Sequence, residues 1–152
     1  MKKVPFPLQA VHDLRELRRE EMERQLAEAA AEIGEAKAQL EEATRLHSVM
    51  VESYAQNYGS GVIDPEAAEM RANYLAALVR RIQAARAHLT QSESAYEAQR
   101  QLAIAAARDA EVTAKLRAKH NAQHASEAAR REQIQLDEMA TAAQARRMAE
   151  GD

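Results

Sequence analysis

The sequence predicts an all-α protein, an antiparallel two-helix coiled-coil hairpin with a longer, partly unpaired C-terminal helix. Composition is the first observation: of 152 residues, 46% are hydrophobic and 30% charged, but only 3% are aromatic and none is tryptophan. Alanine, glutamate and arginine dominate, which is typical of long helices. The second observation is a single short stretch, Asn57–Pro65, that separates two long segments poor in glycine and proline. The third is a heptad pattern of apolar residues on both segments.

The stretch between the segments carries a helix stop signal followed by a start signal. Gly59 and Gly61 can adopt the positive φ values that close a helix C-terminus. Asp64 stands where an N-cap carboxylate accepts backbone N–H groups, and Pro65 fits the first helical position. We therefore expect one elongated coiled-coil domain over residues 1–152, with helix one at about 7–57, the turn at 58–64 and helix two at about 65–149.

The N-terminal segment is extended as far as Pro7, because a residue that precedes proline avoids the α region. Pro7 can serve as the first residue of helix one. Phe6 is the only phenylalanine in the chain. It acts either as a hydrophobic staple at the helix start or as an anchor that docks on a partner.

Helix one carries a predicted seam of apolar residues whose spacing alternates between four and three. Its members are Met22, Leu26, Ala29, Ile33, Ala36, Leu40, Ala43, His47, Met50 and Tyr54. His47 is the only polar member and reads as a tolerated or register-setting residue. Before Met22 the phase changes, because Val11 and Leu14 lie on a rotated stripe. Gly34 follows a seam position and is expected to face solvent.

Helix two carries a matching seam that weakens toward the C-terminus. Its members are Leu75, Leu78, Ile82, Ala85, Leu89, Ser92 and Tyr96, followed by Ala103, Ala106, Ala110 and Thr113. A fold-back about Gly61 places Leu40 near Ile82 and Leu26 near Tyr96, so the two seams agree in register. Helix one then ends opposite about residue 115. The remaining tail has no partner within the chain, yet it carries apolar residues that predict a docking element.

Composition and motifs argue against several classes of function. The net charge is −3 with the charges interspersed, and no aromatic platform accompanies them, so nucleic acid is not an expected partner. There is no cysteine, no signal-peptide core and no apolar stretch long enough for direct membrane insertion. No nucleophile–base pattern or phosphate loop stands out. We expect a protein that is not an enzyme and that uses no cofactor.

Two clusters of polar or charged residues on helix two can be interpreted either as ordinary solvent-exposed surface or as functional sites. His120 and His124 share a helix face and Glu127 follows, but nothing supplies an enclosing shell, so a solvated polar face is favoured and no metal site is expected. Lys115, Arg117 and Lys119 lie in a stretch without acidic residues from Glu111 to Glu127. This is either local charge variation or a positive band that meets an acidic partner surface.

Three segments of the sequence resemble the flagellar export protein FliJ family. The opening Phe-Pro-Leu-Gln-Ala-Val-His-Asp-Leu-Arg-Glu at 6–16 is similar to the start of that family. The Gly-Ser-Gly turn followed by Tyr74-Leu75, Leu78 and Ile82 is similar to its middle, and residues 131–140 resemble its C-terminal motif. The three lie in order and span nearly the whole chain.

The resemblance implies a cytoplasmic component of the bacterial flagellar type III protein export apparatus, needed for flagellum biogenesis and motility. Family members are coiled-coil stalks that resemble the gamma subunit of rotary ATPases. The resemblance implies insertion into the ring of the hexameric flagellar export ATPase, promotion of its assembly and activity, and a link to the export gate membrane protein FlhA. It also implies a position peripheral to the inner membrane at the flagellar base. Some members handle export chaperones.

The resemblance also assigns candidate interface residues. Those for the gate protein are Tyr74, Leu78 and Ile82. Those for the ATPase ring are Phe6, Leu8, Ile134, Leu136, Asp137, Glu138 and Met139. The seam pattern claims Leu78 and Ile82 for the contact between the helices, which leaves Tyr74 as the clearer interface candidate.

Two other readings of the sequence are open. One is the equivalent stalk protein of a virulence-type secretion system, and the Phe-Pro-Leu-Gln opening favours the flagellar version over it. The other is a purely structural coiled coil with no ATPase partner.

Overall fold

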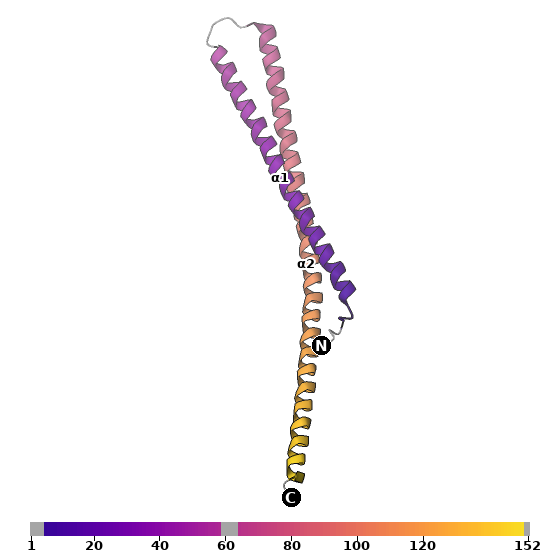
Figure 1. Ribbon diagram of the computed structural model, residues 1–152. Helices are drawn as coiled ribbons and strands as arrows, with labels where there is room; N and C mark the ends of the chain where they lie inside the picture. Colours follow the sequence, from indigo (N-terminus) through magenta and orange to yellow (C-terminus); the bar gives the residue numbers. More distant parts are fainter. Residues whose placement is uncertain (1–4, 59–63, 151–152) are drawn as a thin grey trace. The chain divides into compact units, whose positions relative to one another are not determined.

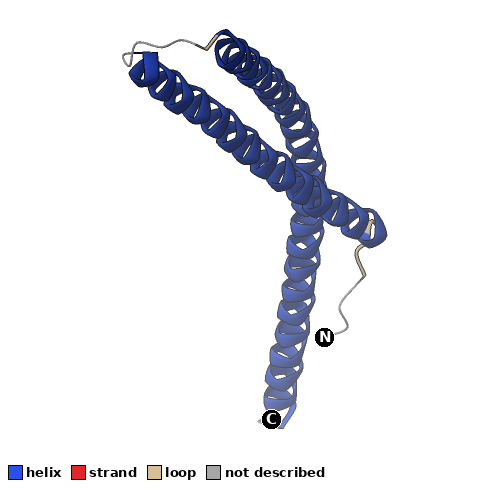
Figure 2. Cartoon of the chain, turned by 90° about the horizontal axis from the view of Figure 1, so that it is seen from above, coloured by secondary structure: helices blue, strands red, loops and turns tan. Residues whose placement is uncertain are grey.

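The computed structural model describes residues 5–58 and 64–150, and these form two long α-helices, α1 (Gln9–Tyr58) and α2 (Pro65–Glu150). The two helices pack against each other as an all-α hairpin (Figure 1). Figure 2 shows no strand in the described part of the chain. Of the turn predicted at 58–64, residues 59–63, which include both glycines, lie outside the described residues. None of the described helices is long and apolar enough to cross a membrane.

Each helix start has a local cause. The N–H of Gln9 donates to the carbonyl of Phe6 (3.1 Å), so Pro7 occupies a turn and α1 begins two residues later than its predicted position at Pro7. At the start of α2, a carboxylate oxygen of Asp64 accepts the N–H of Glu66 at 3.1 Å. This contact confirms the predicted N-cap.

The helices build two compact units, which are described separately. The central unit comprises Glu20–Ala105, and the terminal unit comprises Met1–Arg19 together with Ala106–Asp152. Both units contain a piece of α1 and a piece of α2.

The core of the central unit follows the predicted seams. Every member of the predicted α1 seam from Met22 to Tyr54 is buried or half-buried, and so is every predicted α2 position from Leu75 to Tyr96. Ala36 and Ala43 are completely buried, whereas Gly34 is exposed, and a Cβ added there would meet no atom within 4 Å, so it faces solvent as expected. Cross-helix contacts of Gln99 with Gln25 (3.1 Å) and of His88 with Glu32 (3.9 Å) match the predicted antiparallel register.

The terminal unit corrects two predictions. The seam does not change phase near the start of α1: it is His12 that is buried, while Val11 and Leu14 are exposed. The phase change was predicted from the apolar residues, but the α1 positions that face α2 in this unit are polar. His12 Nδ1 lies 3.3 Å from Thr113 Oγ1, and Arg15 donates to the carbonyl of Asp109.

The second correction concerns the residue of α2 beyond which no other described part of the chain packs on the helix. Cover was expected to end near residue 115, but half-buried side chains continue to Ala128. Phe6, which precedes α1, covers part of this additional length, since its ring packs edge-on against His120 with centroids 5.4 Å apart. Every residue from 129 to 148 is exposed. We call residues 129–148 the tail, and in Figure 1 they form the yellow end of α2.

Candidate functional site: two apolar docking surfaces

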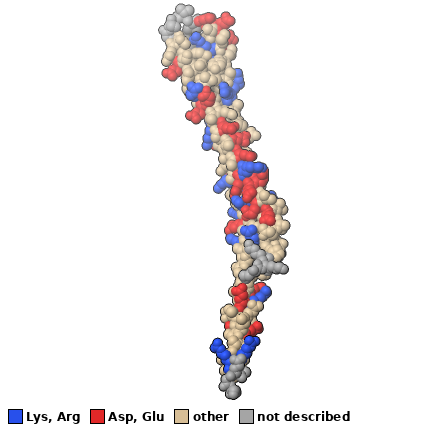
Figure 3. All heavy atoms as spheres, in the orientation of Figure 1, with Lys and Arg blue, Asp and Glu red and all other residues tan. Residues whose placement is uncertain are grey.

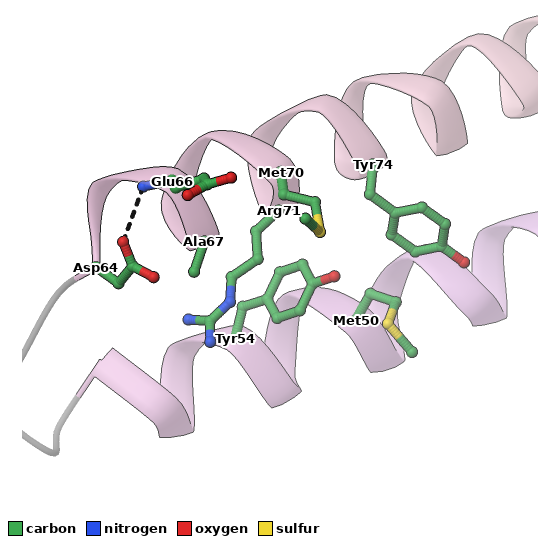
Figure 4. Close-up of a pocket in the computed structure, with 8 residues that line it drawn as sticks. All are labelled: Met50, Tyr54, Asp64, Glu66, Ala67, Met70, Arg71 and Tyr74. Atoms are coloured by element: carbon green, nitrogen blue, oxygen red, sulfur yellow. Dashed lines mark hydrogen bonds between the residues drawn. The ribbon is translucent and has the colours of Figure 1, made fainter.

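An open groove lies between the end of α1 and the start of α2 in the central unit. Its volume is about 610 Å³. The residues that line it are Met50, Tyr54, Asp64, Glu66, Ala67, Met70, Arg71 and Tyr74 (Figure 4). Two methionines and two tyrosines give the groove a flexible, largely apolar wall, which is suited to packing against partners of different shapes.

The lining residues of the groove differ in how firmly they are held. The guanidinium of Arg71 lies over the ring of Tyr54, with 5.3 Å between its central carbon and the ring centroid. This cation–π contact joins α1 to α2. Met70, by contrast, is 68% exposed. In Figure 4 the Tyr74 ring extends from α2 toward Met50 of α1.

The structure separates the three residues that were assigned to the gate protein. Tyr74 is 42% exposed and lines the groove. Leu78 is only 4% exposed and Ile82 is half-buried, so both belong to the seam between the helices. Met70 and Val79 are exposed beside this region, and sequence reasoning missed them. Their signal was available, because both are large apolar residues that lie off the heptad positions.

The tail forms the second surface, in the terminal unit. Ile134, Leu136 and Met139 are 47%, 61% and 69% exposed, and Asp137 and Glu138 are also exposed. At 3.6 residues per turn, Leu136 and Met139 share one face with Ala140 and Ala143, whereas Ile134 lies on a different side. The apolar face of the tail therefore includes Leu136 and Met139 but not Ile134, although all three were predicted to belong to it.

The tail is organised by short-range contacts along the helix. The side-chain amide of Gln133 donates to Asp137 at 3.0 Å, and the hydroxyl of Thr141 donates to the carbonyl of Asp137. None of the contacts recorded within residues 129–148 reaches α1. An uncovered helix of this length is marginal in water unless a partner packs on it.

The other ATPase-ring candidates lie near the start of α1. Leu8 is 43% exposed, while Phe6 is half-buried against His120. The ring of Phe6 packs on α2, a contact that neither the staple nor the anchor interpretation included. Leu8 and the tail both belong to the terminal unit.

Several charges along the helices are paired with opposite charges one turn away on the same helix. Lys115, in the proposed positive band, bonds to Glu111 at 2.6 Å, and this hydrogen bond lowers the pKa of the Glu111 carboxyl. The visible face in Figure 3 mixes acidic and basic side chains along the described helices. Within residues 5–58 and 64–150, no group of three or more histidine, cysteine, aspartate or glutamate side chains converges on a point where a metal ion could sit.

Comparison with known protein families matches residues 3–149 to the family described as flagellar FliJ protein. Comparison with curated proteins and with solved structures gave no match.

Proposed function

The chain belongs to the FliJ family and is a component of the flagellar export apparatus, and from this premise we propose that it is a non-enzymatic stalk of the export ATPase. In this proposal its terminal unit inserts into the ring of the hexameric ATPase and promotes ring assembly and hydrolysis. Its central unit contacts the export gate protein FlhA. The chain acts in the cytoplasm, peripheral to the inner membrane at the flagellar base.

The observation that carries the ATPase contact is the uncovered tail. Leu136 and Met139 are among the most exposed large apolar residues of the chain, and they lie on a helix that no other described part of the chain covers. Exposed apolar residues gathered on one face mark an interaction site more often than isolated ones do. Asp137 and Glu138 add negative charge beside that face, which would favour a partner surface with positive charge.

The mechanism that we propose follows from symmetry. A rod of one or two helices in the pore of a six-membered ring cannot contact all six subunits equally. It binds some subunit interfaces more tightly than others, and differential binding is what shifts a conformational equilibrium. The subunits would therefore hydrolyse ATP in an order and not independently.

The gate contact rests on the groove around Tyr74. Tyr74 and Met70 are exposed there, whereas Leu78 is buried in the seam. We propose that Tyr74 makes the direct contact, and that Leu78 and Ile82 act by holding the two helices at the spacing that forms the groove. Export chaperones are further candidate ligands of this apolar wall.

The test is ATP turnover by the cognate export ATPase, with and without the full-length chain. The wild type should stimulate turnover, and the double variant Leu136→Ser/Met139→Ser should not. Leu102→Ser is the matched control, because Leu102 is 53% exposed on α2 in the other unit. No stimulation by the wild type, under conditions in which the hexamer forms, would favour a structural coiled coil or a chaperone-handling role.

A further inference from the structure

His120 and His124 lie one turn apart on α2, and their rings converge. The two Nε2 atoms are 3.1 Å apart, and the ring centroids are 4.3 Å apart. Two imidazole nitrogens come this close either through an N–H···N hydrogen bond or by sharing a metal ion. Spacing in the sequence alone favours a solvated polar face, but the convergence of the two nitrogens adds an observation that spacing does not contain.

We propose that His120 and His124 form a binding site for a divalent first-row transition-metal ion, of the class that prefers imidazole ligands: Ni²⁺, Cu²⁺ or Zn²⁺. An ion at the usual zinc–imidazole distance of about 2.05 Å from both nitrogens, themselves 3.1 Å apart, would subtend an N–metal–N angle of roughly 98°. That angle lies between the values for two adjacent positions of an octahedron and of a tetrahedron. The separation of the two nitrogens therefore needs little change when the ion binds.

The groups around the two imidazole rings determine which ring nitrogen of each histidine is available to bind a metal ion. A carboxylate oxygen of Glu127 lies 3.8 Å from His124 Nδ1. A carboxylate on that side favours the proton on Nδ1 and leaves the Nε2 lone pair for a metal. His120 Nδ1 is buried with no hydrogen-bond partner among the described residues, so Nε2 is the nitrogen that His120 can offer. The Phe6 ring packs against His120 and limits its rotation.

The site is exposed enough to be filled and emptied. The side chain of His124 keeps 38% of its accessible surface. Because only two protein ligands converge, water would fill the remaining coordination positions, and the ion would exchange readily with a chelator. The nearby charges limit affinity, since Lys119 lies beside His120 in the chain and Arg131 approaches Glu127 at 3.7 Å. The proposal is independent of the ATPase and gate contacts.

The first measurement is thermal unfolding of the full-length chain, without a polyhistidine tag, followed by circular dichroism with added Ni²⁺. Binding to the folded state alone raises the unfolding midpoint, by ~5 °C or more when free metal exceeds the dissociation constant 100-fold. His124→Ala and His120→Ala should abolish the shift, and His47→Ala should retain it. Because His124 is partly exposed, its variant should keep the helical content of the wild type.

The second measurement is electron paramagnetic resonance of the chain with one equivalent of Cu²⁺, which should show two equatorial nitrogen ligands. Glu127→Gln should weaken binding by about tenfold, because it removes the carboxylate behind His124. Glu132→Gln is its matched control and should leave affinity unchanged. A wild type without a thermal shift, or a shift that survives in His124→Ala, would overturn the proposal.

Discussion

His12 of α1 and Thr113 of α2 face each other at the centre of the terminal unit, with Nδ1 3.3 Å from Oγ1. Both residues are almost completely buried, at 4% and 1% exposure. The threonine hydroxyl also lies 2.9 Å from the carbonyl of Ala110, to which it donates. The hydroxyl oxygen therefore accepts the N–H of His12. One polar pair, not an apolar one, joins the two helices at this level.

Thr113→Val should destabilise the terminal unit by about 1–2 kcal/mol, because it keeps the shape but leaves the His12 N–H buried without an acceptor. The double variant His12→Leu/Thr113→Val should recover most of that loss, since it removes both polar partners. Hydrogen exchange of the amides at 10–16 and 110–116 measures both effects. If the double variant were less stable than Thr113→Val, the pair would not be the source of the cost.

Leu78→Ala should destabilise the central unit by about 2–4 kcal/mol, because it leaves a cavity in the seam. Val79→Ala, one residue away and 40% exposed, is the control and should cost well under that. Urea unfolding followed by circular dichroism gives both values. Equal costs for the two variants would contradict the placement of Leu78 inside the seam.

The tail should exchange its amide hydrogens much faster than α2 does between Leu75 and Tyr96. No described part of the chain covers residues 129–148, and local opening is easiest where few side chains are buried. Native-state hydrogen exchange with mass spectrometry measures this difference. Binding of the export ATPase should then slow exchange in the tail, whereas the gate protein should slow it near Tyr74. Uniform protection along the free α2 would argue against an uncovered tail.

Helical stability should fall in acid as ion pairs are lost. Hydrogen bonds to neighbouring side chains lower the pKa of four glutamates: Glu21, Glu42, Glu97 and Glu111. For Glu42 the main cause is Arg45, whose guanidinium lies 2.7 Å from its carboxylate. A carboxyl whose pKa is lower in the folded state stabilises it above the ordinary glutamate pKa of about 4.3, and that contribution disappears as pH falls through the lowered value.

Glu42→Gln should therefore reduce the unfolding midpoint slightly between pH 5 and pH 7 and have no such effect at pH 2. Glu41→Gln removes the same charge one residue away and should have a smaller effect. Thermal unfolding followed at 222 nm across this pH range compares the two. An effect of Glu42→Gln that persisted unchanged at pH 2 would mean that the ion pair is not its cause.

The buried positions of the seam could be predicted from the sequence where apolar residues occupy them, but not where polar residues do. From Met22 to Tyr54 every residue that the alternating spacing selected is buried or half-buried, because burial there largely follows hydrophobicity. Near the start of α1 the same rule selected Val11 and Leu14, which are exposed. Continuing the heptad backward from Met22 would have reached His12, a residue that no hydropathy pattern selects.

The candidate surfaces were predictable to different degrees. The tail follows from the unequal lengths of the helices, which can be counted in the sequence. The groove at Tyr74 could not be predicted in this way, because side chains from both helices form it. The contact between the guanidinium of Arg71 and the ring of Tyr54, for example, does not follow from the seam pattern. The convergence of His120 and His124 likewise depends on ring orientation, which spacing does not determine.

Alanine fills much of the buried seam of the terminal unit, where Ala106 and Ala110 are 4% and 1% exposed. Side chains of equal and minimal volume do not distinguish one heptad from the next, because a sliding step would replace one methyl group with another. The unique alignment of the helices in this unit must come from groups that cannot be exchanged in this way. Such groups are the His12–Thr113 pair, the Phe6 ring on His120 and the contact of Arg15 with the carbonyl of Asp109. These three contacts therefore oppose sliding of the helices in this unit, and a force that broke them would meet little further resistance from the alanine packing.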